Sequence, residues 1–242
     1  RFLRDLYYLG PLRGYPSRIY ARSGAQPRDM GAAGEFVVDA ILSSTERKKR
    51  IGQRQRSQSF ERYVAQWLMR LGMIFDFRVV ALTKGRSLFE VKVRKSPDSA
   101  EVLLTDIGFG VSQILPVLVL CFYVPRKSKV ILEQPEIHLH PSVQAGLADV
   151  FIDAWEQRNV QVLFESHSEH LLLRLQRRIA EGKIKREDVS LYFCSMDDHG
   201  ASNISQLEVD KFGNISNWPK GFFGDQFGEI AAMSEASQKR YG

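Results

Sequence analysis

The sequence predicts an α/β fold in which a mostly parallel sheet is flanked by helices. Short apolar strands alternate with amphipathic helices between residues 112 and 193, a pattern typical of parallel sheets with covered faces. Hydrophobic residues make up 44% of the 242 residues and charged residues 26%, ordinary values for a globular protein with a core. The polar clusters EQPEIHLHP and ESHSEH each follow a predicted strand, at the sheet edge where such folds bind ligands.

The first part of the chain, residues 1–74, is expected to be a loop-rich basic segment followed by a helical insert. Glycines and prolines crowd residues 1–30. The stretch EFVVDAIL (35–42) is expected to start a helix, and residues 43–58 are expected to be flexible. In SFERYVAQWLMRLGM the apolar residues recur at helical spacing up to Gly72, so this stretch predicts an amphipathic helix.

The second part, residues 75–203, is expected to form the α/β core. It opens with a small antiparallel meander, predicted from strand-like segments at 75–82, 87–94 and 101–104. The elements expected after the meander are a helix SQILPVLVLCFY from Ser112, a strand KVILE, a helix that begins at Pro141, a strand at 160–164, a helix at 169–179 and a strand at 189–193.

The remaining residues, 204–242, are expected to form a small C-terminal extension. It contains a strand-like segment, a turn near Gly213 and the aromatic stretch NWPKGFF.

Composition limits the cellular setting. Cys121 and Cys194 both lie in apolar runs, so we expect buried free thiols in a cytoplasmic protein. No apolar stretch reaches the roughly 18–20 residues of a membrane helix, so no membrane partner is expected. The chain opens with RFLRDLYY and lacks an initial Met, so we expect a fragment of a longer protein.

Positive charge is concentrated in the first quarter of the chain. Residues 1–62 hold 13 Lys and Arg against 6 Asp and Glu, an excess of 7, whereas the overall net charge is +6. The densest run, ERKKRIGQRQR, can meet nucleic-acid phosphates or can be a solvated loop; no aromatic residues interleave as stacking platforms. The candidate contacts are Arg47, Lys48, Lys49, Arg50, Arg54 and Arg56.

The strand-end cluster ILEQPE has the composition of a magnesium site. Nucleotide hydrolases hold Mg²⁺ with one or two carboxylates, and Glu133 is placed for this role. The next position usually carries a carboxylate that orients or deprotonates water, but here it is Gln134, so Glu136 is an alternative base.

Two further clusters suit phosphate. His167, in ESHSEH, can hydrogen-bond a terminal phosphate. DIGFGVSQ places small residues at a helix N-terminus, which favours anions. Each signal alone has a structural explanation: Ser168, for instance, can cap the helix that follows it. Arg13 and Arg18, in GPLRGYPSR, are also potential phosphate ligands, but their loop context fixes no geometry.

The order of these motifs resembles the ABC-type head of the AAA-family ATPases related to SMC, RecF and overcoming-lysogenization-defect proteins. DIGFGVSQILPVL resembles the signature motif, VILEQPE Walker B, HLHP the D-loop and ESHSEH the switch-histidine loop. The stretches YYLGPLR and GNISNWPKGFF resemble a bacterial group of predicted ATPases that end in a small uncharacterised domain. Such groups often serve anti-phage defence or DNA-associated processes.

The resemblance implies a homodimer that sandwiches ATP and Mg²⁺ between two heads. Glu133 would serve the metal, and His167 would contact the γ-phosphate. The signature residues would reach the partner's ATP, and His140 with Pro141 would lie at the dimer seam. The signature residues are Gly108, Gly110, Ser112 and Gln113.

Two departures qualify this implication. The sequence contains no G-x-x-x-x-G-K-[ST]: its only Gly-Lys pair, Gly182 and Lys183, is followed by Ile184. The Walker A half is therefore expected outside this chain, which alone should bind ATP poorly. Gln134 cannot accept a proton as a carboxylate does, although Gln can position water, so we expect slow hydrolysis.

Two other functions fit the same residues. In the first, a nucleotide-gated scaffold closes on ATP and recruits an effector, such as a nuclease, with little hydrolysis. In the second, a metal-dependent hydrolase uses imidazole and carboxylate ligands that suit Zn²⁺ or Mn²⁺. Those ligands would come from Glu133, Glu136, His138, His140, His167 and His170. The structural explanation of the H-x-H pair has His138 exposed and His140 packed under the following helix.

Overall fold

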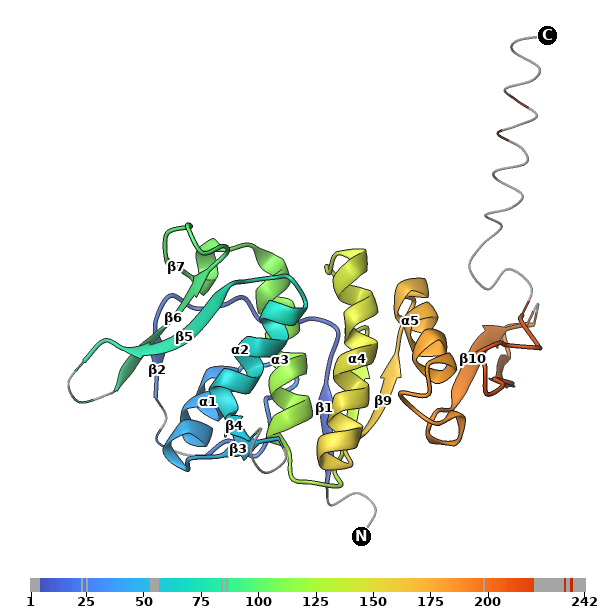
Figure 1. Cartoon of the computed structure of the whole chain (residues 1–242), viewed down its shortest axis with the longest axis horizontal. Coiled ribbons are helices and arrows are strands. Elements are labelled where there is room, and N and C mark those ends of the chain that lie inside the picture. Colours follow the sequence, from blue (N-terminus) through green and yellow to red (C-terminus); the bar gives the residue numbers. More distant parts are fainter. Residues whose placement is uncertain are drawn as a thin grey trace. The chain divides into compact units, whose positions relative to one another are not determined.

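The computed structural model describes residues 5–22, 24, 26–52, 57–83, 85, 87–197, 199–219, 233 and 236. The chain divides into two compact units, Arg1–Arg174 and Leu175–Gly242 (Figure 1). Helix α5 crosses the boundary between them. The predicted domain boundaries, 1–74, 75–203 and 204–242, stay a prediction.

Most of the predicted elements occur, in the predicted order, among the described residues. The helices are α1 (Val37–Glu46), α2 (Phe60–Arg70), α3 (Phe109–Tyr123), α4 (Pro141–Arg158) and α5 (Glu169–Ala180), with short 3-10 helices at Leu104–Asp106 and Arg186–Asp188. The strands are β1 (Leu6–Leu9), β2 (Tyr20–Ala21), β3 (Arg50–Ile51), β4 (Gln58–Ser59), β5 (Asp76–Ala81), β6 (Leu88–Arg94), β7 (Val102–Leu103), β8 (Lys129–Glu133), β9 (Gln161–Glu165), β10 (Leu191–Met196) and β11 (Ser202–Leu207). These elements confirm the predicted α/β fold class.

The central sheet of the first unit is parallel, with strand order β1-β8-β9. Its first strand, β1, lies inside the segment predicted to be loop-rich, so that part of the prediction is wrong. Four residues, LYYL, are too few to show a period, and pairing with β8 joins segments more than 120 residues apart. Only the folded chain brings these two strands together.

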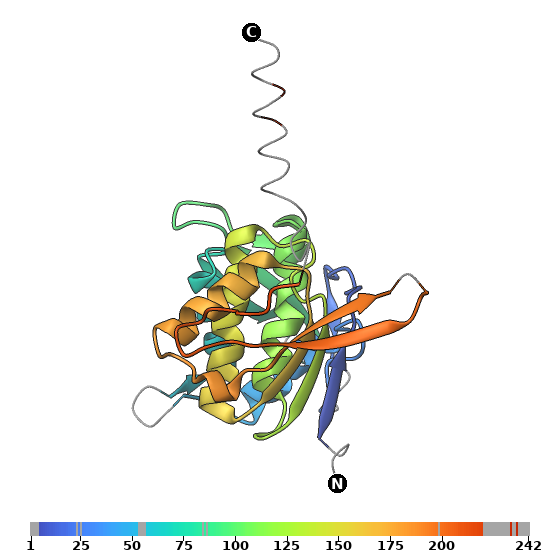
Figure 2. The same cartoon turned by 90° about the vertical axis from the view of Figure 1, so that its right-hand side faces the viewer.

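Helices cover one face of this sheet. Figure 2 shows α3 and α4 on one side of its strands, and the Phe151 ring of α4 lies 5.0 Å from the Phe164 ring of β9. On the opposite face Tyr8 and Leu163 are 42% and 63% exposed, on either side of Ile131 in the register. These two side chains are therefore open to solvent in the described part of the chain.

Helix α3 forms the centre of the core, and its residues from Val111 to Tyr123 are all buried. It contacts α1, α2 and α4 as well as β8. The helix begins at Phe109, three residues before the predicted start, because Gly108, with φ of 104°, supplies the preceding turn. The apolar run of this segment is thus explained by the burial of the helix on all sides.

Gly34 offers a test of packing against α3. Its φ is +83°, and a Cβ there would lie 2.8 Å from Pro116 Cγ. Gly72 has φ of +70° and open space around its Cβ position. We expect Gly72→Ala to lower the free energy of unfolding by about 1–2 kcal/mol through backbone strain. Gly34→Ala should lower the free energy of unfolding by about 1–3 kcal/mol more than Gly72→Ala does, because it also overpacks the core. Urea denaturation of both variants measures the difference. Equal losses would contradict this packing.

The predicted antiparallel meander is confirmed by β5, β6 and β7, and the short strand β2 also pairs with β6. The strand predicted at 189–193 does not join the parallel sheet. It forms β10, which pairs antiparallel with β11 in the second unit. The Asp197 carboxylate accepts hydrogen bonds from the backbone N–H groups of His199 and Ala201, and this turn favours local pairing.

The two cysteines are free, as predicted, but only Cys121 is buried, whereas Cys194 is exposed on β10. Burial raises the pKa of the Cys121 thiol to about 12. In the described part of the chain, every helix is too short or too polar to cross a lipid bilayer.

Candidate functional site

The carboxyl ends of β8 and β9 lie side by side and bring two predicted clusters together. Glu133 and Glu165 are direct neighbours in the strand register. Gln134 follows the first strand, and His167 follows the second by two residues. Because parallel strands end at the same edge of a sheet, the strand-end carboxylate and the histidine loop share one side of the molecule.

Glu133 closes β8 and is half-buried. The Tyr8 hydroxyl donates a hydrogen bond to Glu133 Oε1 at 2.9 Å, from the neighbouring strand β1. This bond to a carboxylate raises the pKa of Tyr8 above its usual value. A carboxylate has about four lone-pair positions, so one phenol leaves Glu133 with capacity for a metal ion.

Gln134 is oriented toward Glu165. Its φ of 44° places it in the left-handed region, and its backbone N–H donates to the Glu165 carbonyl at 3.0 Å. Its side-chain Nε2 donates to Glu165 Oε1 at 3.4 Å. His167 Nε2 lies 3.8 Å from the same oxygen. Glu165 was missed in the sequence, although it ends its strand as Glu133 does.

Glu136 ties the β8 tip to the histidine loop. It is only 7% exposed, and its Oε1 accepts a hydrogen bond from the His167 backbone N–H at 2.8 Å. Within the described residues, its Oε2 has no hydrogen-bond partner. A buried carboxylate held in this way positions the loop that carries the His167 imidazole.

Arg13 also contacts the tip of β8. The residue is 5% exposed, and its guanidinium donates to the carbonyl oxygens of Glu133 at 3.3 Å and Gln134 at 3.4 Å. Burial lowers the pKa of Arg13 to about 10, an effect that the nearby Glu136 charge partly offsets. No sequence pattern indicates this role, because the contacts span more than 100 residues.

The predicted signature segment lies beside the HLHP segment. The Phe109 ring is 5.3 Å from the His138 ring, and a Cβ at Gly110 would lie 3.9 Å from the His138 carbonyl oxygen. Gly108 is exposed, whereas Ser112 and Gln113 are buried. Ser112 Oγ donates to the Phe109 carbonyl at 2.7 Å. The exposed part of this segment is therefore its glycine end.

The two histidines of HLHP are both exposed. His138 is exposed as expected, but His140 is exposed too and does not pack under α4. Instead it caps that helix, because its Nδ1 accepts a hydrogen bond from the Ser142 N–H at 3.3 Å. Ser168 caps α5 in the same manner through the Leu171 N–H, as the structural explanation predicts.

The metal-dependent hydrolase finds no support. Over the described ranges, no group of three or more His, Cys, Asp or Glu side chains is arranged to hold a metal ion. An ATP-bound magnesium ion needs only one or two protein carboxylates, and Glu133 fits that smaller demand. The residues present thus fit the metal side of an ATP site, while the sequence has no glycine-lysine loop to cradle the triphosphate.

The described part of the basic run includes the end of α1 and strand β3, and the Lys49 side chain packs against two aromatic rings. Arg47, Lys48 and Arg50 are exposed. Lys49 Nζ lies 5.1 Å from the centre of the Phe60 ring and 4.7 Å from that of Tyr123. The Lys49 ammonium group is thus directed toward these two rings. Two other candidate contacts, Arg54 and Arg56, lie outside the described residues.

Lys49 gives a pH-dependent prediction. Burial, and then the Arg158 charge, lower its pKa from 10.5 to about 7. The charged form is disfavoured only in the folded state, so its cost is full below about pH 7 and disappears as the pH rises toward the unfolded pKa. Lys49→Met should therefore stabilise the protein more at about pH 6 than at about pH 10, by on the order of 2 kcal/mol.

The measurement is chemical denaturation of the wild-type and variant proteins at both pH values. Lys48→Met, at the exposed neighbouring lysine, is the control and should give the same small difference at each pH. A Lys49→Met effect that is independent of pH would contradict the inward, charge-penalised placement of Lys49.

Solved structures with a similar arrangement include SMC proteins. One, from work described as "Structural biochemistry of ATP-driven dimerization and DNA stimulated activation of SMC ATPases", is 13% identical over 62% of this chain and 84% of that chain, with a TM-score of 0.47. The Smc head bound to the C-winged helix domain of ScpA is 13% identical over 62% and 43%, with a TM-score of 0.45. The Pyrococcus furiosus Smc head with an extended coiled coil, bound to the C-terminal domain of ScpA, is 13% identical over 61% and 34%, with a TM-score of 0.42.

No curated protein matches the chain significantly. Two family models do match it. Residues 184–233 match a family described as a protein of unknown function (DUF3696), in agreement with the uncharacterised C-terminal domain that the sequence suggested. Residues 40–172, more than half of the chain, match the AAA ATPase domain and include the Glu133, Glu165 and His167 cluster. The chain therefore belongs to the AAA ATPase domain family.

Proposed function

We propose that this chain supplies the metal and water side of an ATP-hydrolysing site. Glu133 would hold Mg²⁺, which when bound neutralises charge on the phosphates. The observation that carries the proposal is the pairing of Glu133 with Glu165 in register, with His167 held beside them through Glu136. A glycine-lysine loop absent from these 242 residues would cradle the triphosphate.

The neighbouring residues have distinct proposed roles. His167 would donate a hydrogen bond to the terminal phosphate, and Gln134 would orient water. Gly108 and Gly110 would face the nucleotide of a second copy across a homodimer, with His140 near the seam. Ser112 and Gln113 would support this helix start from inside, because both are buried.

We further propose Glu165 as the carboxylate that replaces the missing acid at position 134. A general base must reach the water it deprotonates. The Glu165 side chain is well exposed, and it lies next to both Gln134 and His167. Glu136 is buried and one of its oxygens is already engaged, so it suits a positioning role better.

The experiment compares ATP turnover of the full-length protein with Glu165→Gln and Glu136→Gln variants. Loss of a general base typically costs about 10²–10⁴-fold, so Glu165→Gln should lower kcat within that range. Glu136→Gln keeps an oxygen that accepts from the His167 N–H and should lower kcat less than tenfold. A larger loss of kcat in Glu136→Gln than in Glu165→Gln would assign the base to Glu136. Unchanged turnover in both variants would exclude both residues as the base.

Gln134 at the usual base position also favours slow hydrolysis and a nucleotide-gated scaffold. A scaffold that recruits an effector, for instance in anti-phage defence, would keep its biological activity in a Glu165→Gln variant that still binds ATP. A hydrolysis-driven machine would lose it. Measuring turnover with and without duplex DNA tests the proposed nucleic-acid partner, for which exposed Arg47, Lys48 and Arg50 are the described candidates.

A further inference from the structure

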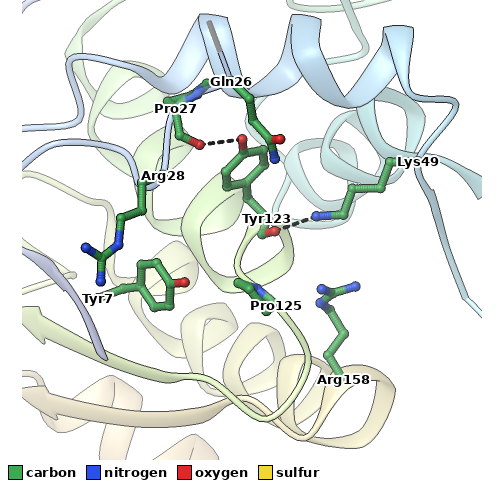
Figure 3. Close-up of a pocket in the computed structure, with 8 residues that line it drawn as sticks. All are labelled: Tyr7, Gln26, Pro27, Arg28, Lys49, Tyr123, Pro125 and Arg158. Atoms are coloured by element: carbon green, nitrogen blue, oxygen red, sulfur yellow. Dashed lines mark hydrogen bonds between the residues drawn. The ribbon is translucent and has the colours of Figure 1, made fainter. Parts of the chain in front are cut away.

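A cavity lies within the first unit, at the opposite end of the sheet from Glu133. Its volume is about 460 Å³, inside the range of about 300–1,000 Å³ that is usual for small-molecule sites. Tyr123 ends α3 before β8, and Arg158 ends α4 before β9, so the cavity faces the amino ends of these strands. Figure 3 shows the side chains of Lys49 and Arg158 on one side of Tyr123 and those of Arg28 and Tyr7 on the other.

The lining of this cavity is cationic. It includes Arg28, Lys49 and Arg158, and none of the described residues that line it is acidic. The Arg126 charge also acts on Arg158 and lowers its pKa, after the larger effect of burial. Burial raises the pKa of Tyr7, and the charges of Asp5 and Asp29 raise it further, so these carboxylates lie toward the Tyr7 end. The Lys49 and Arg158 end thus carries the excess positive charge.

Helix capping explains only part of this charge. Lys49 Nζ donates to the Tyr123 carbonyl, and Arg158 donates to the Val124 carbonyl, so both cations contact the C-terminus of α3. A helix C-terminus carries roughly half a negative charge, which the Arg158 charge alone exceeds, and Lys49 adds to the excess when it is protonated. Arg158 is only 8% exposed, and its Nε has no hydrogen-bond partner among the described residues. The two side chains therefore favour an additional anion.

We propose that this cavity binds the phosphate group of a phosphorylated small molecule. Lys49 and Arg158 would contact the phosphate oxygens, since charge-assisted hydrogen bonds to phosphate are strong. The Tyr7 and Tyr123 rings would line the space for the organic part of the ligand. This site does not depend on the proposed ATPase function, because it shares no residue with the Glu133, Glu165 and His167 cluster.

The test is isothermal titration calorimetry of the full-length protein with inorganic phosphate and with AMP, at constant ionic strength. Lys49→Met should weaken binding tenfold or more, because one charged hydrogen bond is lost. Lys48→Met changes an exposed neighbouring lysine and should bind as the wild type does, within about twofold. Lys49→Arg restores the charge and should recover most of the affinity. Thermal unfolding of each variant confirms that it folds. Lys49→Gln is used as a second variant that also removes the charge.

Two outcomes overturn the proposal: no binding of either probe by the wild type, or equal binding by the wild type and Lys49→Met. A titration with duplex DNA distinguishes a nucleic-acid ligand from a phosphorylated small molecule. If Lys49→Met weakens DNA binding while neither small probe binds, the cavity serves nucleic acid and the small-molecule proposal fails. ATP turnover is measured separately, and Lys49→Met should leave it within about twofold, so failure here is distinguishable from failure of the ATPase proposal.

Discussion

Glu133→Gln is expected to lower ATP turnover of the full-length protein by about 100-fold or more. Glu133 is the carboxylate at the end of β8, and it is the residue to which the proposal assigns the metal ion. An amide neither carries the negative charge nor matches the affinity of a carboxylate for Mg²⁺, so stabilisation of phosphate charge is lost. A 100-fold change corresponds to about 2.7 kcal/mol in the activation free energy. The measurement is steady-state turnover at saturating ATP and magnesium.

Tyr8→Phe is the matched control for this prediction. It removes the hydroxyl that donates to Glu133 Oε1 at 2.9 Å but leaves the carboxylate in place. Turnover should fall by less than about tenfold, since only the orientation of Glu133 is relaxed. Similar turnover in the wild type and Glu133→Gln would remove Glu133 from the metal site and, with it, the main support for the proposed function.

Arg13→Met is expected to lower the free energy of unfolding by about 3 kcal/mol. The guanidinium is buried, donates to two backbone carbonyls at the β8 tip, and is the positive charge next to buried Glu136. Its removal takes a charged donor from both carbonyls and the nearby positive charge from Glu136, and each hydrogen bond to a charged group contributes about 1.5–3 kcal/mol. Urea denaturation of the full-length protein measures this loss. If unfolding occurs in more than one transition, the first transition is compared between the wild type and the variant.

Arg18→Met supplies the comparison, because Arg18 lies in the same loop but is exposed. Its NH2 group lies 3.0 Å from Asp106 Oδ1 in a surface ion pair, which contributes about 0.2–1 kcal/mol. The two substitutions remove the same charge from neighbouring positions. If both proteins unfold at the same urea concentration, Arg13 does not have the buried structural role assigned to it.

Local patterns in the sequence predicted much of the fold. The strand KVILE and the helix start at Pro141 coincide with the observed β8 and α4. The amphipathic spacing before Gly72 matches α2, and the meander matches β5, β6 and β7. These elements were predictable because periodicity, caps and turn residues act over a few positions along the chain.

Pairings between distant segments were not predictable in this way. β1 was missed because its four residues form a strand only beside β8. β10 was assigned to the parallel sheet, although it pairs with the strand that follows it in the sequence. An apolar segment of this length is compatible with either partner, and its neighbours in space decide between them.

The candidate site shows the same division. Glu133, Gln134 and His167 were identified from the residue types at two strand ends, and Glu165 was missed although it occupies the equivalent position on β9. The role of Arg13 arises from contacts across more than 100 residues, and no local pattern encodes them.

By itself the sequence determined the α/β class, the order of most elements and the acidic and imidazole residues at the strand ends, because local spacing and chemistry specify these features. Only the tertiary structure decided that Arg13 and Glu136 lie buried around one tip, that Lys49 turns into a cationic cavity and that His140 caps a helix. Burial and charge environment depend on which distant segments pack together, and that information is distributed over the whole chain.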